Sequence, residues 1–100
     1  MALWKNCRMD SLFYSAKADT NEPCEVRIDE REIVVTYARD DGVTYTGRND
    51  GTGHFELHAN RYNGRASLHM FPGGSVLEGY WLETPIGGAE ERGMWRIVLA

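Results

Sequence analysis

Alternation of apolar and polar residues, repeated in one short segment after another, constrains this chain more than any other feature of its sequence. Between Gly53 and Leu99 the alternation is interrupted only at turns, and nearly every turn carries a glycine. A period of two places successive side chains on opposite faces of a β-strand. The pattern therefore predicts a small antiparallel β domain in which one face of each strand is apolar.

The expected strands follow one another with short connections. Upstream of this region the alternation starts at Cys24, and residues 8–17 alternate as a further strand. A short helix through Leu3, Trp4 and Cys7 is the competing prediction for the N-terminal segment, and 19–23 has the composition of a loop. The other expected strands are 24–28, 33–37, 43–48, 54–60, the segment between the turns at 62–65 and 72–75, 76–83 and 93–99.

The first two turn sequences predict how their strands pair. Asp40–Gly42 and Asn49–Gly51 each end in glycine, which suits a three-residue hairpin loop whose glycine adopts the left-handed conformation. Loops of this length set Tyr37 opposite Tyr45, and Tyr45 opposite Phe55. The predicted register keeps these aromatic side chains on one face of the sheet.

Two further turns extend the sheet. Asn63–Gly64 is a strong signal for a tight hairpin, and this turn would place Leu57 opposite Met70. With Gly73–Gly74 as the central pair of the next turn, Met70 would lie opposite Leu77. Each predicted pairing joins strands that are neighbours in sequence, so the expected topology is an up-and-down meander.

One face of the expected sheet collects enough apolar side chains for a single core. One hundred residues make one domain, residues 1–100, and are too few for two. A meander of seven strands, with an eighth from the N-terminus, hides its edges best by closing into a small barrel, and a β-sandwich is the alternative. The residues expected on the apolar face are Val35, Tyr37, Val43, Tyr45, Phe55, Leu57, Leu68, Met70, Leu77, Trp81, Trp95, Ile97 and Leu99.

The last quarter of the chain resembles a known group of barrels. The run Leu77–Trp81, followed by Gly87–Glu90, Arg92 and Trp95, resembles the last two strands of avidin-type barrels. Those proteins belong to the calycin group together with lipocalins and fatty-acid-binding proteins. The resemblance implies a small up-and-down barrel. It implies no ligand, because the ligand-contacting residues of the group are not matched upstream.

Composition and charge exclude several classes of function. The 11 Lys and Arg residues against 15 Asp and Glu residues give a formal net charge of −4, whereas a protein that binds the phosphate backbone of nucleic acid is basic. No apolar run approaches the ~20 residues of a membrane-spanning helix. The first residues lack the apolar region of a secretory signal, so we expect a cytoplasmic protein in which Cys7 and Cys24 are reduced thiols.

Three histidines and two carboxylates fall on the polar face of the expected sheet. His54, Glu56 and His58 share one side of a strand because their spacing is two. The predicted hairpins place His69 opposite His58, and Glu78 opposite His69. Imidazole and carboxylate groups in this arrangement can bind zinc or a similar divalent metal ion. One hypothesis is therefore a metal-dependent enzyme, although this face is also expected to be the outer, solvated surface of a barrel.

The apolar interior suggests a second kind of site. An eight-stranded barrel is either filled by its own side chains or holds one small ligand. Gly47 and Gly79, expected to point inward, would leave room for a ligand or would simply relieve the curvature of the strands. The side chains expected to contact a small apolar or aromatic ligand are Tyr37, Tyr45, Phe55, Met70, Trp81 and Trp95.

The sequence thus favours a non-catalytic binding domain without a tightly bound cofactor. It carries no nucleophile-elbow or cysteine-protease signature. A third hypothesis is a protein-interaction module that binds another protein or forms a homodimer. Tyr80 and Phe71, expected on the polar face, would then mark the contact surface.

Overall fold

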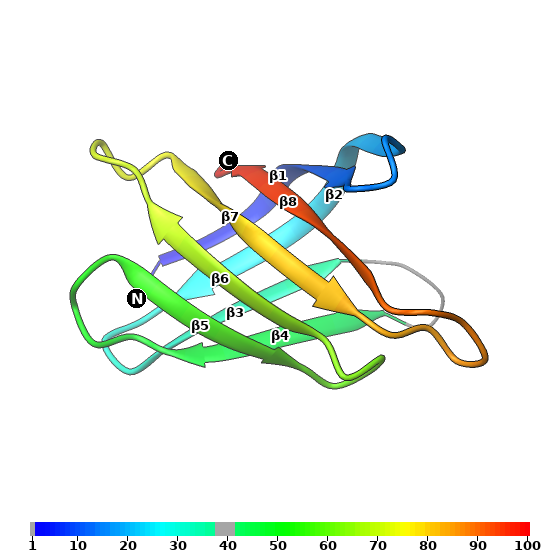
Figure 1. The fold of residues 1–100 in the computed structure, drawn as a ribbon. Coiled ribbons are helices and arrows are strands. Elements are labelled where there is room, and N and C mark those ends of the chain that lie inside the picture. Colours follow the sequence, from blue (N-terminus) through cyan, green and yellow to red (C-terminus); the bar gives the residue numbers. More distant parts are fainter. Residues whose placement is uncertain (1, 38–41) are drawn as a thin grey trace.

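Eight antiparallel strands form one closed barrel in the computed structural model, which describes residues 2–37 and 42–100 (Figure 1). Each strand pairs with its neighbours in sequence, and the last strand pairs with the first. The strands are β1 (Ala2–Phe13), β2 (Ala18–Ile28), β3 (Glu32–Tyr37), β4 (Val43–Arg48), β5 (His54–Ala59), β6 (Arg65–Met70), β7 (Val76–Glu83) and β8 (Glu91–Val98).

The pairing of β1 with β8 decides between the two architectures that the sequence left open. The two strands pair continuously, from Arg8 opposite Val98 to Phe13 opposite Gly93. A β-sandwich would have two separate sheets, whereas here a single sheet closes on itself. The predicted up-and-down meander closing into a barrel is therefore confirmed. Within the described ranges there is no helix of the length and apolarity needed to cross a membrane.

The first two strands begin earlier than predicted, and the first one ends at Phe13 and not at residue 17. β1 begins at Ala2, so the helix considered for the N-terminal segment is wrong. β2 begins at Ala18, so the polar segment 19–23, expected to be a loop, lies within a strand. Met9 of β1 lies opposite Glu22 of β2. Pairing with a neighbouring strand thus outweighs the local preference of these residues for a loop.

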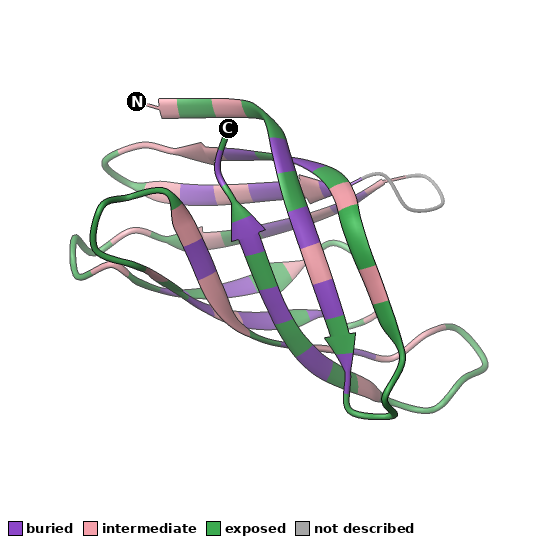
Figure 2. Ribbon diagram, turned by 90° about the horizontal axis from the view of Figure 1, so that it is seen from above, coloured by how far each residue is buried: buried purple, intermediate pink, exposed green. Residues whose placement is uncertain are grey.

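Burial alternates along the strands and separates an inner from an outer face (Figure 2). In β3, Ile33, Val35 and Tyr37 are buried, whereas the residues between them are partly exposed. The residues predicted to form the apolar face are buried, except Met70, which is half-buried and packs against them. The N-terminal strands complete the core with Cys7, Met9, Phe13, Cys24 and Val26.

The predicted register of the β3–β4 hairpin is wrong, although its faces are right. Tyr45 lies opposite Val35 and not opposite Tyr37. Asp40 and Asp41 of the predicted turn lie outside the described residues. Because the shift is by two residues, the inward side chains stay inside the barrel.

The two hairpins that contain β5 have longer connections than predicted. Residues 49–53 connect β4 to β5, and residues 60–64 connect β5 to β6. As a result, the predicted pairs on both sides of β5 are wrong, whereas the predicted register between β6 and β7 is confirmed. The observed pairs are Tyr45–Ala59, Leu57–Ala66 and Met70–Leu77.

Two glycines predicted to leave room in the interior instead allow adjacent strands to approach closely. A Cβ atom on Gly79 would overlap the backbone carbonyl of Ser67 on β6, and one on Gly47 would overlap the carbonyl of Glu56 on β5. Backbone already occupies the space beside these glycines. The hypothesis that they leave space for a ligand is therefore wrong, and their role is in the close packing of the strands.

Cys7 and Cys24 lie opposite one another on β1 and β2, and both are free thiols in the core. Burial raises the pKa of the Cys24 thiol to about 12, and the neighbouring Cys7 adds to the effect. The Cys24 thiol is therefore neutral at pH values at which an exposed cysteine would ionise.

We expect the fold to lose stability as the pH rises from 9.0 to about 12. In this range Cys24 keeps its proton in the folded state and loses it in the unfolded state, so rising pH favours unfolding. Urea unfolding across this range should show a steeper loss of the free energy of unfolding for the wild type than for Cys24→Ala. Equal slopes for the two proteins would contradict the assignment of this effect to Cys24.

Candidate functional site at the barrel mouth

The connections β1–β2, β5–β6 and β7–β8 gather at one end of the barrel, which we call the mouth (Figure 1). Two backbone hydrogen bonds join elements there. The Thr84 amide donates to the Tyr62 carbonyl at 2.7 Å, and the Tyr14 amide donates to the Arg92 carbonyl at 2.9 Å. The first bond joins the β7–β8 connection to the β5–β6 connection, and the second joins the β1–β2 connection to β8.

Five aromatic side chains pack together inside the barrel near the mouth, and we call them the aromatic cluster. The rings of Tyr45 and Trp95 meet edge to face with centroids 4.8 Å apart. The rings of Trp81 and Trp95 stack with centroids 6.0 Å apart, and the rings of Trp81 and Phe13 are nearly perpendicular with centroids 4.9 Å apart. Tyr37 contacts both Tyr45 and Trp95. Such ring pairs stabilise the fold beyond the area that they bury.

A buried carboxylate lies against the aromatic cluster. Glu83 is the last residue of β7, two positions after the inward-facing Trp81, and it is only 6% exposed. Its Oε2 accepts a hydrogen bond from the Tyr37 hydroxyl at 2.7 Å and another from the Tyr45 hydroxyl. Two hydroxyl donors on one oxygen stabilise a negative charge on the carboxylate.

The Tyr45 hydroxyl is held in its neutral, donating form. Burial, followed by the hydrogen bond to Glu83, raises the pKa of Tyr45 far above its usual range. Tyr45 therefore keeps its proton at pH values at which an exposed tyrosine would ionise, so its hydroxyl remains a donor.

The other carboxylate oxygen of Glu83, Oε1, accepts no hydrogen bond from the residues that the structure describes. It is not sealed from solvent, because across the described ranges only Trp81 Nε1 is a fully buried side-chain nitrogen or oxygen without a partner. Glu83 also lines a pocket at the mouth. Oε1 is therefore the oxygen of this pocket-lining carboxylate that is left for a further hydrogen bond.

This pocket at the mouth, which we call the mouth pocket, has a volume of about 270 Å³. Below it, the void between the aromatic cluster and Ser11 measures only about 10 Å³, which is room for one water molecule at most. A ligand larger than water therefore fits in the mouth pocket and not among the rings of the cluster. The mouth pocket is lined by Phe13, Tyr62, Trp81, Glu83, Pro85, Ile86 and Glu91.

The lining combines aromatic surfaces with negative charge. Phe13, Tyr62 and Trp81 supply the rings, and Glu83 and Glu91 supply two carboxyl groups. No lysine, arginine or histidine is among the described residues that line the pocket. The pocket thus has apolar walls and two acidic groups. In a pocket of this kind, a few polar contacts are enough to orient a ligand.

Four of the six predicted ligand-binding residues come together in the aromatic cluster, and two do not. Phe55 and Met70 lie opposite Leu68 and Leu77, away from the mouth. Of these four predicted residues, Trp81 is the one that also lines the mouth pocket. Tyr37 and Tyr45 instead hold Glu83 in place from inside, and Trp95 packs between Tyr37, Tyr45 and Trp81.

The structure brings part of the set predicted to bind a metal ion together, because the rings of His54 and His69 lie 5.9 Å apart between their centres, but it leaves His58 out of the group. His69 lies opposite His54 and not opposite His58, although Glu78 lies opposite His69 as predicted. His54 Nε2 is 3.1 Å from Glu56 Oε2. In the part of the chain that the structure describes, no three His, Cys, Asp or Glu residues could hold a metal ion together. The longer β5–β6 connection separates the predicted pair His58 and His69.

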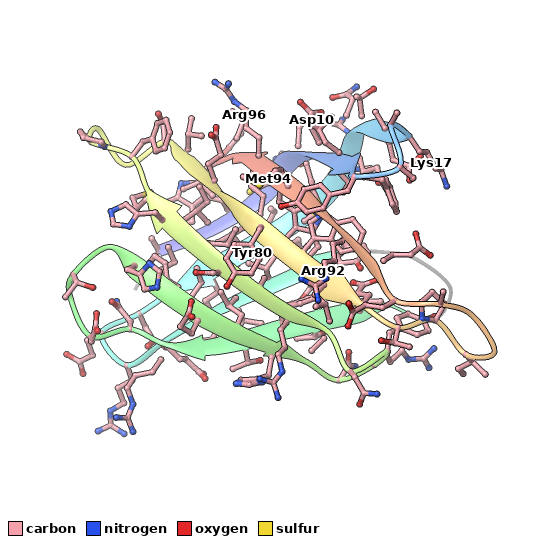
Figure 3. All side chains as sticks on the ribbon, in the orientation of Figure 1. Asp10, Lys17, Tyr80, Arg92, Met94 and Arg96 are labelled. Carbon is pink, nitrogen blue, oxygen red and sulfur yellow. The ribbon has the colours of Figure 1, made fainter. Side chains whose placement is uncertain are left out.

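The outer face of β7, β8 and β1 carries an apolar row. Tyr80 lies opposite Met94, and Met94 lies opposite Leu12 (Figure 3). Tyr80 and Phe71 are 52% and 44% exposed, so their predicted exposure is confirmed. The charged residues Arg92 and Arg96 on β8 and Asp10 on β1 lie on either side of the row (Figure 3). The homodimer expected from the sequence remains a prediction.

Sequence reasoning did not single out Glu83, Glu91 or Phe13 as site residues. A signal for Glu83 was nevertheless present. It continues the inward series that runs through Gly79 and Trp81 at a spacing of two. An acidic residue at an inward position near the end of a barrel strand indicates a buried carboxylate that needs partners.

Comparison with known proteins places this chain in no family. No family model matches it, and no curated protein and no solved structure matches it. The closed eight-stranded meander is consistent with the calycin-like architecture that the resemblance implied. The geometry of the mouth is therefore the basis for a functional interpretation.

Proposed function

We propose that this protein is a non-catalytic binding protein that holds one small molecule in the mouth pocket. The observation that carries the proposal is the Oε1 atom of Glu83. It has no partner of its own among the described residues. It belongs to a carboxylate that is fixed by two tyrosine hydroxyls, on a residue that lines a 270 Å³ pocket with aromatic walls. A concave, mostly apolar pocket with a few fixed polar groups is typical of ligand sites.

The barrel supports this function because its site is built before a ligand arrives. Tyr37 and Tyr45 orient Glu83 from the packed interior, and the hydrogen bond from Thr84 to Tyr62 holds one wall in position. A preformed site loses little conformational entropy when it binds, which favours affinity in a small pocket. The pocket lining contains no serine, cysteine or histidine among the described residues, so binding is a better match to its chemistry than nucleophilic catalysis.

A fragment screen by two-dimensional NMR of the ¹⁵N-labelled protein tests the proposal. The library should contain cationic, neutral and anionic fragments in equal numbers, so that charge does not bias the result. We expect bound fragments to shift the backbone amide signals of Phe13, Glu83 and Glu91, which line the mouth pocket. The signals of outward-facing residues such as Glu25 should not move.

Two tyrosine variants provide the matched comparison. Tyr62→Ala removes an aromatic wall of the pocket, whereas Tyr80→Ala removes a ring from the outer face. We expect only the first to weaken fragment binding. A screen in which fragments consistently bind the outer face, or fail to bind the mouth, would overturn the proposal.

A further inference from the structure

We infer that the ligand of the mouth pocket is a small organic cation whose ammonium group donates a hydrogen bond to Glu83 Oε1. This inference rests on the proposed function and specifies its ligand class. Three independent features of the pocket support it: the unpaired carboxylate oxygen, the aromatic walls and the sign of the surrounding charge.

The carboxylate of Glu83 is only half satisfied by the protein. Both hydroxyl donors, from Tyr37 and Tyr45, reach Oε2, and no described Lys, Arg or His side chain forms an ion pair with Glu83. A buried carboxylate without a countercharge is costly. A cationic donor at Oε1 would supply both the missing hydrogen bond and the missing charge.

The walls of the pocket suit a cation as well. Phe13, Trp81 and Tyr62 present aromatic rings to the pocket, and the face of an aromatic ring attracts a positive charge within about 6 Å of its centroid. Phe13 already interacts with a cation in this way, because Lys17 Nζ lies 4.9 Å from the centre of its ring. Aromatic walls combined with a carboxylate are a recurring environment for organic ammonium groups.

The charge of the lining disfavours the other ligand classes. An anion would meet Glu83 and Glu91 with no basic residue among the described lining to compensate. A neutral donor could still bind Oε1, but its hydrogen bond would lack the second charge and be roughly half as strong. The volume of the pocket, about 270 Å³, is just below the ~300–1,000 Å³ of typical ligand pockets, so the expected cation is small.

Three compounds of nearly equal size and shape test the inference by NMR titration at near-neutral pH and low salt. They are 2-phenylethylamine, which is cationic, 2-phenylethanol, which is neutral, and phenylacetate, which is anionic. We expect the amine to bind at the mouth about tenfold more tightly than the alcohol, and phenylacetate not to bind. Added salt should weaken binding of the amine and leave binding of the alcohol unchanged.

Glu83→Gln keeps an acceptor for the two tyrosine hydroxyls and removes the charge. This variant should lower the affinity for 2-phenylethylamine by about tenfold or more and leave the affinity for 2-phenylethanol nearly unchanged. Glu25→Gln, at an exposed position of β2, is the control that should change neither affinity. If Glu83→Gln does not fold, Glu91→Gln takes its place, with a smaller loss of amine affinity expected.

The outcomes separate this inference from the proposed function. If the alcohol or phenylacetate binds at the mouth as tightly as the amine, or if amine binding survives loss of the Glu83 charge, the cationic ligand class is overturned and the binding function stands. If the amine fails to bind while other fragments occupy the mouth, the same conclusion follows. If nothing binds at the mouth, both are overturned.

Discussion

Replacing Gly79 with alanine is expected to destabilise the barrel by about 3 kcal/mol or more, or to prevent folding. A Cβ atom at this position would overlap the backbone carbonyl of Ser67 and would come within 2.9 Å of the Cα atom of Leu68. These are backbone atoms of the paired strand β6, so they cannot move aside as a flexible side chain could. The added methyl group must therefore push β6 and β7 apart.

Gly88→Ala is the matched control for this prediction. Gly88 lies in the β7–β8 connection, and a Cβ atom there would meet Pro85 only at an ordinary contact distance of 3.4 Å. Its free energy of unfolding in urea should stay within about 0.5 kcal/mol of the wild type. If Gly79→Ala were as stable as Gly88→Ala, the close approach of β6 and β7 would be contradicted.

Removing the Tyr45 hydroxyl is expected to cost roughly 1.5–3 kcal/mol of stability, because the hydroxyl donates to a buried charged group. Tyr45 is fully buried and shares Oε2 of Glu83 with Tyr37. In Tyr45→Phe the ring still packs against Trp95, and only the hydrogen bond is lost. Tyr45→Ala also removes the ring, and a total loss of about 4 kcal/mol or more is expected.

Two comparisons separate the hydrogen bond from general effects of substitution. Tyr80→Phe removes a hydroxyl from a half-exposed ring on the outer face, and we expect its stability to stay within about 0.5 kcal/mol of the wild type. In a Glu83→Gln background, Tyr45→Phe should cost less than it does in the wild type, since the acceptor is then neutral. An equal cost for Tyr45→Phe and Tyr80→Phe in urea unfolding would show that the bond to Glu83 contributes nothing.

The arrangement of faces could be predicted from the sequence because it depends only on the period of two. Val35 and Tyr45 were expected inside the barrel, and Tyr80 outside, and the structure places all three there. Closure into a barrel was also predictable. An open meander has two edge strands with unpaired backbone groups, and these groups pair when the barrel closes. These inferences need the order of residues but not the exact length of any turn.

The registers could not be predicted, because they depend on loop length. A shift of one strand by an even number of residues leaves the alternation of apolar and polar residues unchanged. Pairing Tyr45 with Phe55, as predicted, keeps the same face inside as the observed pairing with Ala59. The error mattered most on the outer face, where it created an apparent cluster from His58 and His69 that the structure separates. A cluster inferred from predicted registers is therefore weaker than a core inferred from the same pattern.

The mouth pocket could be predicted only in part. Trp81 was expected to contact a ligand, and it does line the pocket. Glu83 and Glu91 were not expected there, because the sequence alone does not show which end of the barrel collects the open connections or how far the aromatic side chains fill the interior. The hydrogen bonds from Tyr37 and Tyr45 to Glu83 join residues 46 and 38 positions apart in the chain.

A crystal structure of the protein with a bound fragment would test the central claim most directly. We predict electron density in the mouth pocket beside Trp81 and Tyr62, with a donor atom of the fragment within hydrogen-bond distance of Glu83 Oε1 and both tyrosine hydroxyls still on Oε2. A fragment bound only on the outer face, beside Tyr80 and Met94, would contradict the claim that the mouth is the functional site.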